Sequence, residues 1–143
     1  MVDFQTTTTK VGRKQDTRWR ASQHASDVAR PGQLNPALFT AGTHYNLNGA
    51  TDNVIPSGVA VGQVTATKLY GPYDATANDG RQVLAGYIND NDGVELGLTP
   101  ASAKPTFAVL KHALIKASVL PLAAQRAAVL TANSSGSFIY VED

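Results

Sequence analysis

Short runs in which apolar and polar residues alternate follow one another from residue 34 onward, and turn residues separate them. A period of two bounded by Gly, Pro, Asn or Asp is typical of β-strands. The 82–88 run is apolar on both faces, which indicates a central strand. The pattern predicts strands at 38–40 (a weak one), 59–69, 82–88, 94–98, 106–110, 113–120 and 137–141.

Turns and one helix complete the predicted body. Tyr70-Gly71-Pro72-Tyr73 predicts a turn after the long strand, and we expect 94–98 to form a hairpin with 82–88. An Ala-rich helix through 106–120 is the alternative to the two strands there. Pro121 followed by alanines predicts a short helix, whose core face carries Leu122, Val129 and Leu130. The predicted class is mainly β (α+β): a small compact barrel-like or tulip-like body with one short C-terminal helix.

The first 33 residues differ from the rest of the chain. Residues 1–30 hold six basic and three acidic residues, and their large apolar residues are limited to Val2, Phe4, Val11, Trp19 and Val28. Such a segment buries too little apolar surface to offset its ordering entropy on its own. We therefore predict an extended N-terminal arm at 1–33 and a globular β-rich domain at 34–143. The alternation of Val2, Phe4, Thr6 and Thr8 suits a strand added to a partner's sheet edge; the alternative is a threonine-rich tail without register.

Composition narrows the classes of protein that remain. A chain of 143 residues is long enough for one domain, and a net charge of +1 gives no argument for a globally basic or acidic protein. The absence of cysteine excludes disulfides, thiolate metal sites and a cysteine nucleophile. The longest apolar stretches are broken by Lys116 and Pro121 and are too short to span a membrane. Charged residues make up 16% of the chain, which indicates a polar but lightly charged surface. Such surfaces are often found in proteins that assemble with other subunits.

Residues that carry catalysis or bind metals are sparse. The chain has three histidines, His24, His44 and His112, and no two of them have metal-ligand spacing. The run at 90–93 resembles part of a calcium loop. The first and twelfth positions of that loop would be Ile88 and Thr99, however, and neither carries a carboxylate. Nucleophile-elbow and phosphate-loop motifs are missing. We expect no catalytic residues, no metal site and no cofactor; an enzyme would need a pocket around His44 or His112.

Arg18-Trp19-Arg20 is the tripeptide with the most binding potential. A nucleic-acid interpretation places the arginines on phosphates and stacks Trp19 on a base. A protein-docking interpretation uses the same side chains as interface anchors, because Trp and Arg are enriched at hot spots. We favour docking, since the body offers no basic and aromatic surface that would continue a nucleic-acid track; a passive solvated tail is the third interpretation.

Three segments carry a resemblance to a known family. IPSGVAVG at 55–62, LYGPYD at 69–74 and DGRQVLAGY at 79–87 resemble head decoration proteins of tailed bacteriophages. Among these, the chain looks most like those of actinobacterial phages, distant relatives of the lambda-type head decoration protein. The Pro-x-Leu-Phe-Thr piece at 36–40 and the order of the last strands and helix agree with it. The resemblance covers roughly residues 34–143.

The resemblance implies a structural role. Relatives sit as trimers at the three-fold and quasi-three-fold positions of the mature head. Their N-terminal segments run over the major capsid protein, and they cement the shell against the pressure of packaged DNA. It therefore implies a homotrimer on the outer surface of the virion, with no active site; the alternative is a nucleic-acid-binding or other phage structural or adaptor module that uses the basic arm. The expected capsid-binding arm residues are Val2, Phe4, Thr6, Thr8, Arg13, Arg18, Trp19 and Arg20, and the expected trimer contacts are Leu69, Tyr70, Pro72 and Tyr73.

Overall fold

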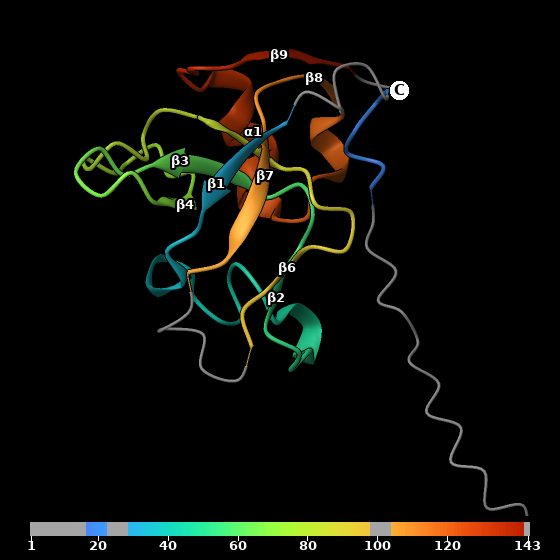
Figure 1. Ribbon diagram of the computed structural model, residues 1–143. Coiled ribbons are helices and arrows are strands. Elements are labelled where there is room, and N and C mark those ends of the chain that lie inside the picture. The colour runs from blue at the N-terminus through green and yellow to red at the C-terminus, as the bar shows by residue number, and fades with distance from the viewer. Residues whose placement is uncertain (1–16, 23–28, 98–103, 142–143) are drawn as a thin grey trace, which may run out of the picture.

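The computed structural model describes residues 17–22, 29–97 and 104–141, and its body is built around one antiparallel sheet (Figure 1). The five strands lie in the order β1-β7-β5-β3-β4. Their bounds are Arg30–Gln33 (β1), Thr106–Leu110 (β7), Gly86–Ile88 (β5), Ala60–Gln63 (β3) and Tyr70–Pro72 (β4). The mainly β class is therefore confirmed.

Two smaller sheets flank the central one. β2 (Val54–Ile55) pairs antiparallel with β6 (Val94–Glu95), and β8 (His112–Ile115) pairs parallel with β9 (Ser137–Tyr140). Figure 1 shows β8 and β9 beside α1, and β2 with β6 at the opposite end of the body. These pairings leave the described residues as an open, layered β-structure.

The central sheet is not a closed barrel. Its outer strands β1 and β4 approach each other at one isolated bridge, between Leu34 and Tyr70. The Asn35 amide donates to the Tyr70 carbonyl over 2.9 Å at that point. One bridge is far from the continuous ladder that closes a barrel. The barrel-like shape expected from the sequence is thus reduced to a sheet whose edges touch once.

Alternate residues of the central strands feed two separate cores, one on each face of the sheet. On β5, Ile88 belongs to one apolar cluster and Tyr87 to the other; on β7, Val109 and Leu110 divide in the same way. This is the two-residue period of a strand with both faces covered. The prediction that 82–88 forms a central strand is confirmed for Gly86–Ile88, the third of five strands.

The predicted turn at 70–73 is wrong. Tyr70–Pro72 is strand β4, paired with β3 through Val61–Pro72 and Gln63–Tyr70. The chain reverses earlier, where the Val64 amide donates to the Leu69 carbonyl and Lys68 adopts a left-handed φ of 62°. The 59–69 strand therefore ends at Gln63, because a hairpin with a tight reversal needs positive φ rather than a proline.

Several other local predictions also change. The 94–98 strand is shortened to Val94–Glu95 within the described residues and pairs with β2 instead of β5. Residues 38–40 form no strand, because Leu38 ends a 3-10 helix, Pro36–Leu38, which is capped by the Asn35 side chain. Strands at 106–110 and 137–140 match the prediction, while 113–120 is a strand through Ile115 and then a 3-10 helix, Ala117–Val119. The Ala-rich helix through 106–120 is absent from this described stretch.

The predicted C-terminal helix is present as α1, Ala123–Ala128, followed by a 3-10 helix at Val129–Thr131. Leu122 and Val129 are buried as expected, but Leu130 is 51% exposed. The switch from α-helix to 3-10 helix changes the angle between successive residues, and so it turns Leu130 away from the core. Gln125, a polar residue, occupies a buried position on the core face of α1.

Candidate functional site

A groove with a volume of about 670 Å³ lies between α1 and two loops. One wall is the 121–128 segment, another is the loop containing His44, and the third follows the end of β4. Apolar atoms come from Leu47, Pro72 and the alanines of α1. The ionisable side chains at its lining are His44, Tyr73, Asp74 and Arg81.

His44 is held in one tautomer by the turn in which it lies. Its Nδ1 accepts a hydrogen bond from the Thr40 amide at 2.9 Å, so the proton of the neutral ring resides on Nε2. Burial lowers the pKa of His44, the Arg81 charge lowers it further, and Asp74 opposes both. The imidazole is therefore neutral at physiological pH and offers one N–H donor.

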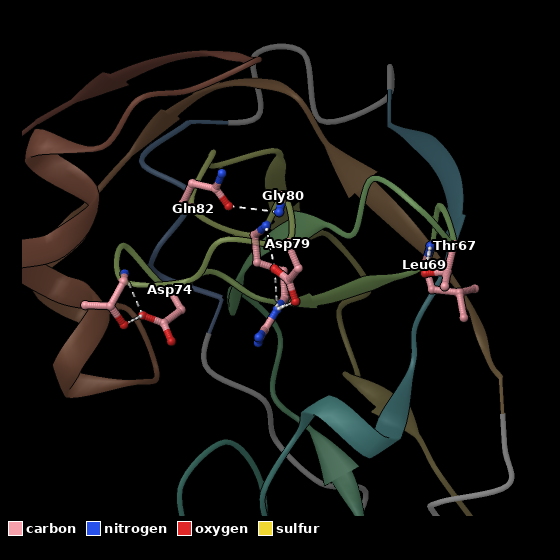
Figure 2. Close-up of polar contacts among 8 residues, drawn as sticks. Thr67, Leu69, Asp74, Asp79, Gly80 and Gln82 are labelled. Atoms are coloured by element: carbon pink, nitrogen blue, oxygen red, sulfur yellow. Dashed lines mark hydrogen bonds and ion pairs between the residues drawn. The ribbon is translucent and has the colours of Figure 1, made fainter.

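The charged residues of the groove are braced by their own loop (Figure 2). Asp74 Oδ1 accepts from the Thr76 amide at 2.9 Å and from the Thr76 hydroxyl at 2.7 Å, and these bonds hold the Asp74 pKa below its usual value. The Arg81 Nε donates to both carboxylate oxygens of Asp79, at 3.2 and 3.0 Å. A carboxylate, a guanidinium and an imidazole thus line the groove.

We expect the free energy of unfolding to fall as the pH drops below 6.5 because of His44. The His44 pKa is lower in the folded state than in the unfolded state, so below pH 6.5 the unfolded chain binds more protons than the folded chain. The stabilisation that comes from neutral His44 is therefore complete above pH 6.5. It is lost as the pH falls toward and through the lowered pKa of the folded state. Asp74 and Asp79 have lowered pKa values, so they change the free energy of unfolding only in the more acidic range below pH 3.8. Urea unfolding between neutral pH and about pH 5 measures the His44 effect separately.

The matched variants for this test are His44→Gln and His112→Gln. The first should flatten the pH dependence, and the second removes a histidine that is exposed and outside the groove. An unchanged slope in His44→Gln would contradict the assignment of the effect to His44.

A second feature is the place where the N-terminal segment meets the body. Trp19 is completely buried, and its ring stacks on Tyr87 with centroids 5.8 Å apart. The indole Nε1 donates to the Ser57 hydroxyl at 3.2 Å. A Cβ built on Gly58 would lie 2.6 Å from the Trp19 ring, so only glycine fits there. We name the surface formed by Ser57, Gly58 and Tyr87 the Trp19 slot.

The slot changes how the predicted arm is divided. Trp19 was expected to be an exposed capsid anchor, but it is a core residue because it is the largest apolar side chain of its segment and fills a slot of matching shape. Arg30–Gln33 is strand β1 of the central sheet. Two described segments of the predicted arm, 17–22 and 30–33, therefore belong to the body.

The other predicted contact residues divide into three groups. Arg18 is exposed, and Arg20 is half-buried with its guanidinium bonded to Asn89 and Asn91. The expected trimer residues contribute to the chain's own fold: Tyr70 and Tyr73 are each only 7% exposed, Pro72 is buried and Leu69 is half-buried. In the described fold these four side chains are buried or half-buried, so they expose little surface; their role in a trimer stays a prediction. Val2, Phe4, Thr6, Thr8 and Arg13 lie outside the described residues.

Sequence reasoning found His44 but missed its neighbours. Asp74 and Arg81 come from a loop that folds back on itself, and α1 meets that loop only through tertiary packing, so no spacing in the sequence signals the groove. In the part of the chain that the structure describes, no three His, Asp or Glu side chains gather as a metal site. Among the same residues, no helix is long and apolar enough to cross a membrane.

No family model, curated protein or solved structure matches this chain.

Proposed function

We propose that this chain is a structural capsid decoration protein, which binds as trimers at three-fold and quasi-three-fold positions of a mature phage head. The observation that carries the proposal is the way the N-terminal segment is attached. Trp19 is buried, its carbonyl accepts from the Lys116 amide just after β8, and the Ala21 amide donates to the Leu114 carbonyl of β8. An arm that is fixed to its body in this manner transmits force from a partner to the folded domain.

The attachment sets the arm's length. Because Trp19 belongs to the body, we propose that the capsid-binding part of the arm is residues 1–16, half of the 1–33 expected from composition. Sixteen residues, if extended, would span about 50 Å. Val2, Phe4, Thr6 and Thr8 lie within this part and keep the alternation suited to strand addition. Three arms on one trimer would gain avidity from their common tether.

The nucleic-acid alternative has lost its stacking residue. Trp19 is fully buried against Tyr87, so it offers no face to a base in this conformation. The Arg20 guanidinium is bonded to Asn89 and Asn91 and lies 5.2 Å from the centre of the Trp19 ring. Burial also removes Trp19 as a docking anchor, but the docking function keeps Val2 and Phe4 as apolar anchors and is therefore the better supported of the two.

Deleting residues 1–16 should weaken binding to mature heads of the source phage by at least about tenfold while leaving the body folded. The reason is that the deletion removes the strand-forming part of the arm but stops before the Trp19 slot. Co-sedimentation of full-length and truncated protein with purified heads measures the loss, and thermal unfolding checks the body.

A full-length Val2→Ser/Phe4→Ser variant is the matched control. It keeps the length and charge of the arm and removes its apolar anchors, so it should lose part of the same affinity. Full binding by the truncated protein would remove the arm from the mechanism, and absence of binding by the full-length chain would contradict the decoration function itself.

A further inference from the structure

The groove between α1 and the His44 loop contains a cation whose hydrogen-bonding capacity the protein leaves partly unused. The Arg81 Nε donates to Asp79, but the two Nη groups have no hydrogen-bond partner among the described residues. The Arg81 side chain is only 18% exposed, and in the part of the chain that the structure describes no fully buried side-chain nitrogen or oxygen lacks a partner, so the Nη groups reach solvent. Because Arg81 lines the groove, these donors are available to a molecule bound in it.

Two further polar groups of the lining are available in the same way. The Thr40 amide occupies the His44 Nδ1, which leaves the Nε2–H as a donor without an acceptor among the described residues. Asp74 Oδ1 accepts both bonds from Thr76, whereas Asp74 Oδ2 accepts none from the same part of the chain. The groove therefore offers donors from a cation and from a neutral ring, and an acceptor from an anion.

The positive and negative charges of the groove lie close together without forming an ion pair. The Asp74 amide donates to the Arg81 carbonyl at 3.2 Å, so the two residues are neighbours across their loop. Both charges also act on His44, whose pKa Arg81 lowers and Asp74 raises. Of the described residues, however, it is Asp79 that forms the salt bridge with Arg81. Opposite charges that face one groove and do not contact each other are complementary to a ligand that carries both charges on a short frame.

The rest of the lining is mainly apolar. It includes Leu47, Pro121, Ala123, Ala124 and Ala128. Alanine and proline side chains are short, so the wall formed by α1 and the residues before it leaves room for an apolar group of a ligand. The volume of about 670 Å³ is within the range of small-molecule sites, which combine an apolar lining with a few placed polar groups.

We propose that this groove binds a free α-amino acid with a large apolar side chain. The carboxylate of the ligand accepts from the Arg81 Nη groups and from the His44 Nε2–H, its ammonium donates to Asp74 Oδ2, and its side chain packs against the α1 wall. An α-amino acid carries both charged groups on one carbon, which suits the neighbouring Arg81 and Asp74, whereas a peptide separates them. The inference goes beyond the proposed function, because the groove contains no residue of the N-terminal arm.

The test titrates the purified full-length chain with L-phenylalanine and with L-leucine by isothermal titration calorimetry at about pH 7, where these ligands are zwitterions. N-acetyl-L-phenylalanine lacks the ammonium, and L-phenylalaninamide lacks the carboxylate. Each derivative should bind at least about tenfold more weakly than L-phenylalanine, because it leaves one charged group of the groove without its partner. Absence of binding by both amino acids, or equal affinity for L-phenylalanine and its two derivatives, would overturn the proposal.

Two full-length variants assign the charged groups of the ligand to the residues of the groove. Asp74→Asn keeps an oxygen for the Thr76 bonds and removes the charge, so it should weaken L-phenylalanine by at least about tenfold without weakening N-acetyl-L-phenylalanine. Arg81→Lys keeps the charge but loses the planar pair of donors, so it should weaken L-phenylalanine without weakening L-phenylalaninamide. Far-UV circular dichroism checks that each variant is folded.

The matched control is Asp92→Asn, which removes the same charge at an exposed position outside the groove and should bind L-phenylalanine as the parent chain does. Equal affinities of Asp74→Asn and Asp92→Asn would contradict the placement of the ligand in this groove. Because the titrations use no phage heads, a failure of amino-acid binding is distinguishable from a failure of the decoration proposal.

Discussion

Replacing Trp19 by alanine is expected to lower the free energy of unfolding by about 3–5 kcal/mol, the range for truncating a buried Trp or Phe. Trp19 is completely buried, stacks on Tyr87 and donates a hydrogen bond to Ser57. The truncation leaves a cavity and removes the main apolar contact of the 17–22 segment. Urea unfolding followed by far-UV circular dichroism measures the loss, because the variant has no tryptophan signal.

Neighbouring and conservative substitutions separate packing from charge. Arg18→Ala changes an exposed residue of the same segment and should alter the stability by no more than about 0.5 kcal/mol. Trp19→Phe keeps an aromatic ring but loses the indole N–H, so its cost should be intermediate. If Trp19→Ala were as stable as the parent, the N-terminal segment would not belong to the body and the arm would again extend to residue 33.

Replacing Gln125 by methionine is expected to cost about 2 kcal/mol, although methionine has a similar size and is the more apolar residue. The Gln125 amide accepts from the Ala60 N–H at 2.9 Å and donates to the Ala60 carbonyl at 3.0 Å, with a longer contact of 3.5 Å to the Tyr73 carbonyl. These bonds attach α1 to the sheet just beyond the end of β4. Methionine leaves the buried Ala60 N–H without an acceptor, and an unmet buried donor costs more than the apolar gain.

The measurement is the urea-unfolding midpoint at constant slope. Ala127→Gln is the matched control, because it changes an exposed residue of the same helix. It should move the stability by no more than about 0.5 kcal/mol. A stabilising effect of Gln125→Met would contradict the view that this side chain completes the main-chain bonding of β3.

The local pattern was sufficient for part of the fold. β7, β9 and β5 (the last part of the predicted 82–88 strand) were predicted because β-branched, aromatic and other apolar residues specify an extended, half-buried or fully buried strand wherever it pairs. Helix α1 was predicted because proline and alanine favour a first helical turn irrespective of its surroundings. In each case the signal lies within a few neighbouring residues.

The pairing of strands was not available from those signals. Val94–Glu95 pairs with β2 instead of β5, and Tyr70–Pro72 forms a strand although its Gly-Pro pair is typical of turns. Which edges meet depends on the whole set of buried faces, so tertiary packing overrides local turn chemistry. The groove of His44, Asp74 and Arg81 could not be predicted from local signals either, since its walls come from three separate segments that only tertiary packing brings together.

The sequence by itself determined the mainly β class, the most regular strands, the short helix and a polar, basic N-terminal segment, because composition and period act locally. Only the tertiary structure decided where that segment meets the body. Trp19 is one apolar residue among polar neighbours, and such a residue can anchor to a partner or fill a core with equal ease. The choice was made by a slot whose parts, Ser57, Gly58 and Tyr87, come together only when β3, β5 and β8 are folded.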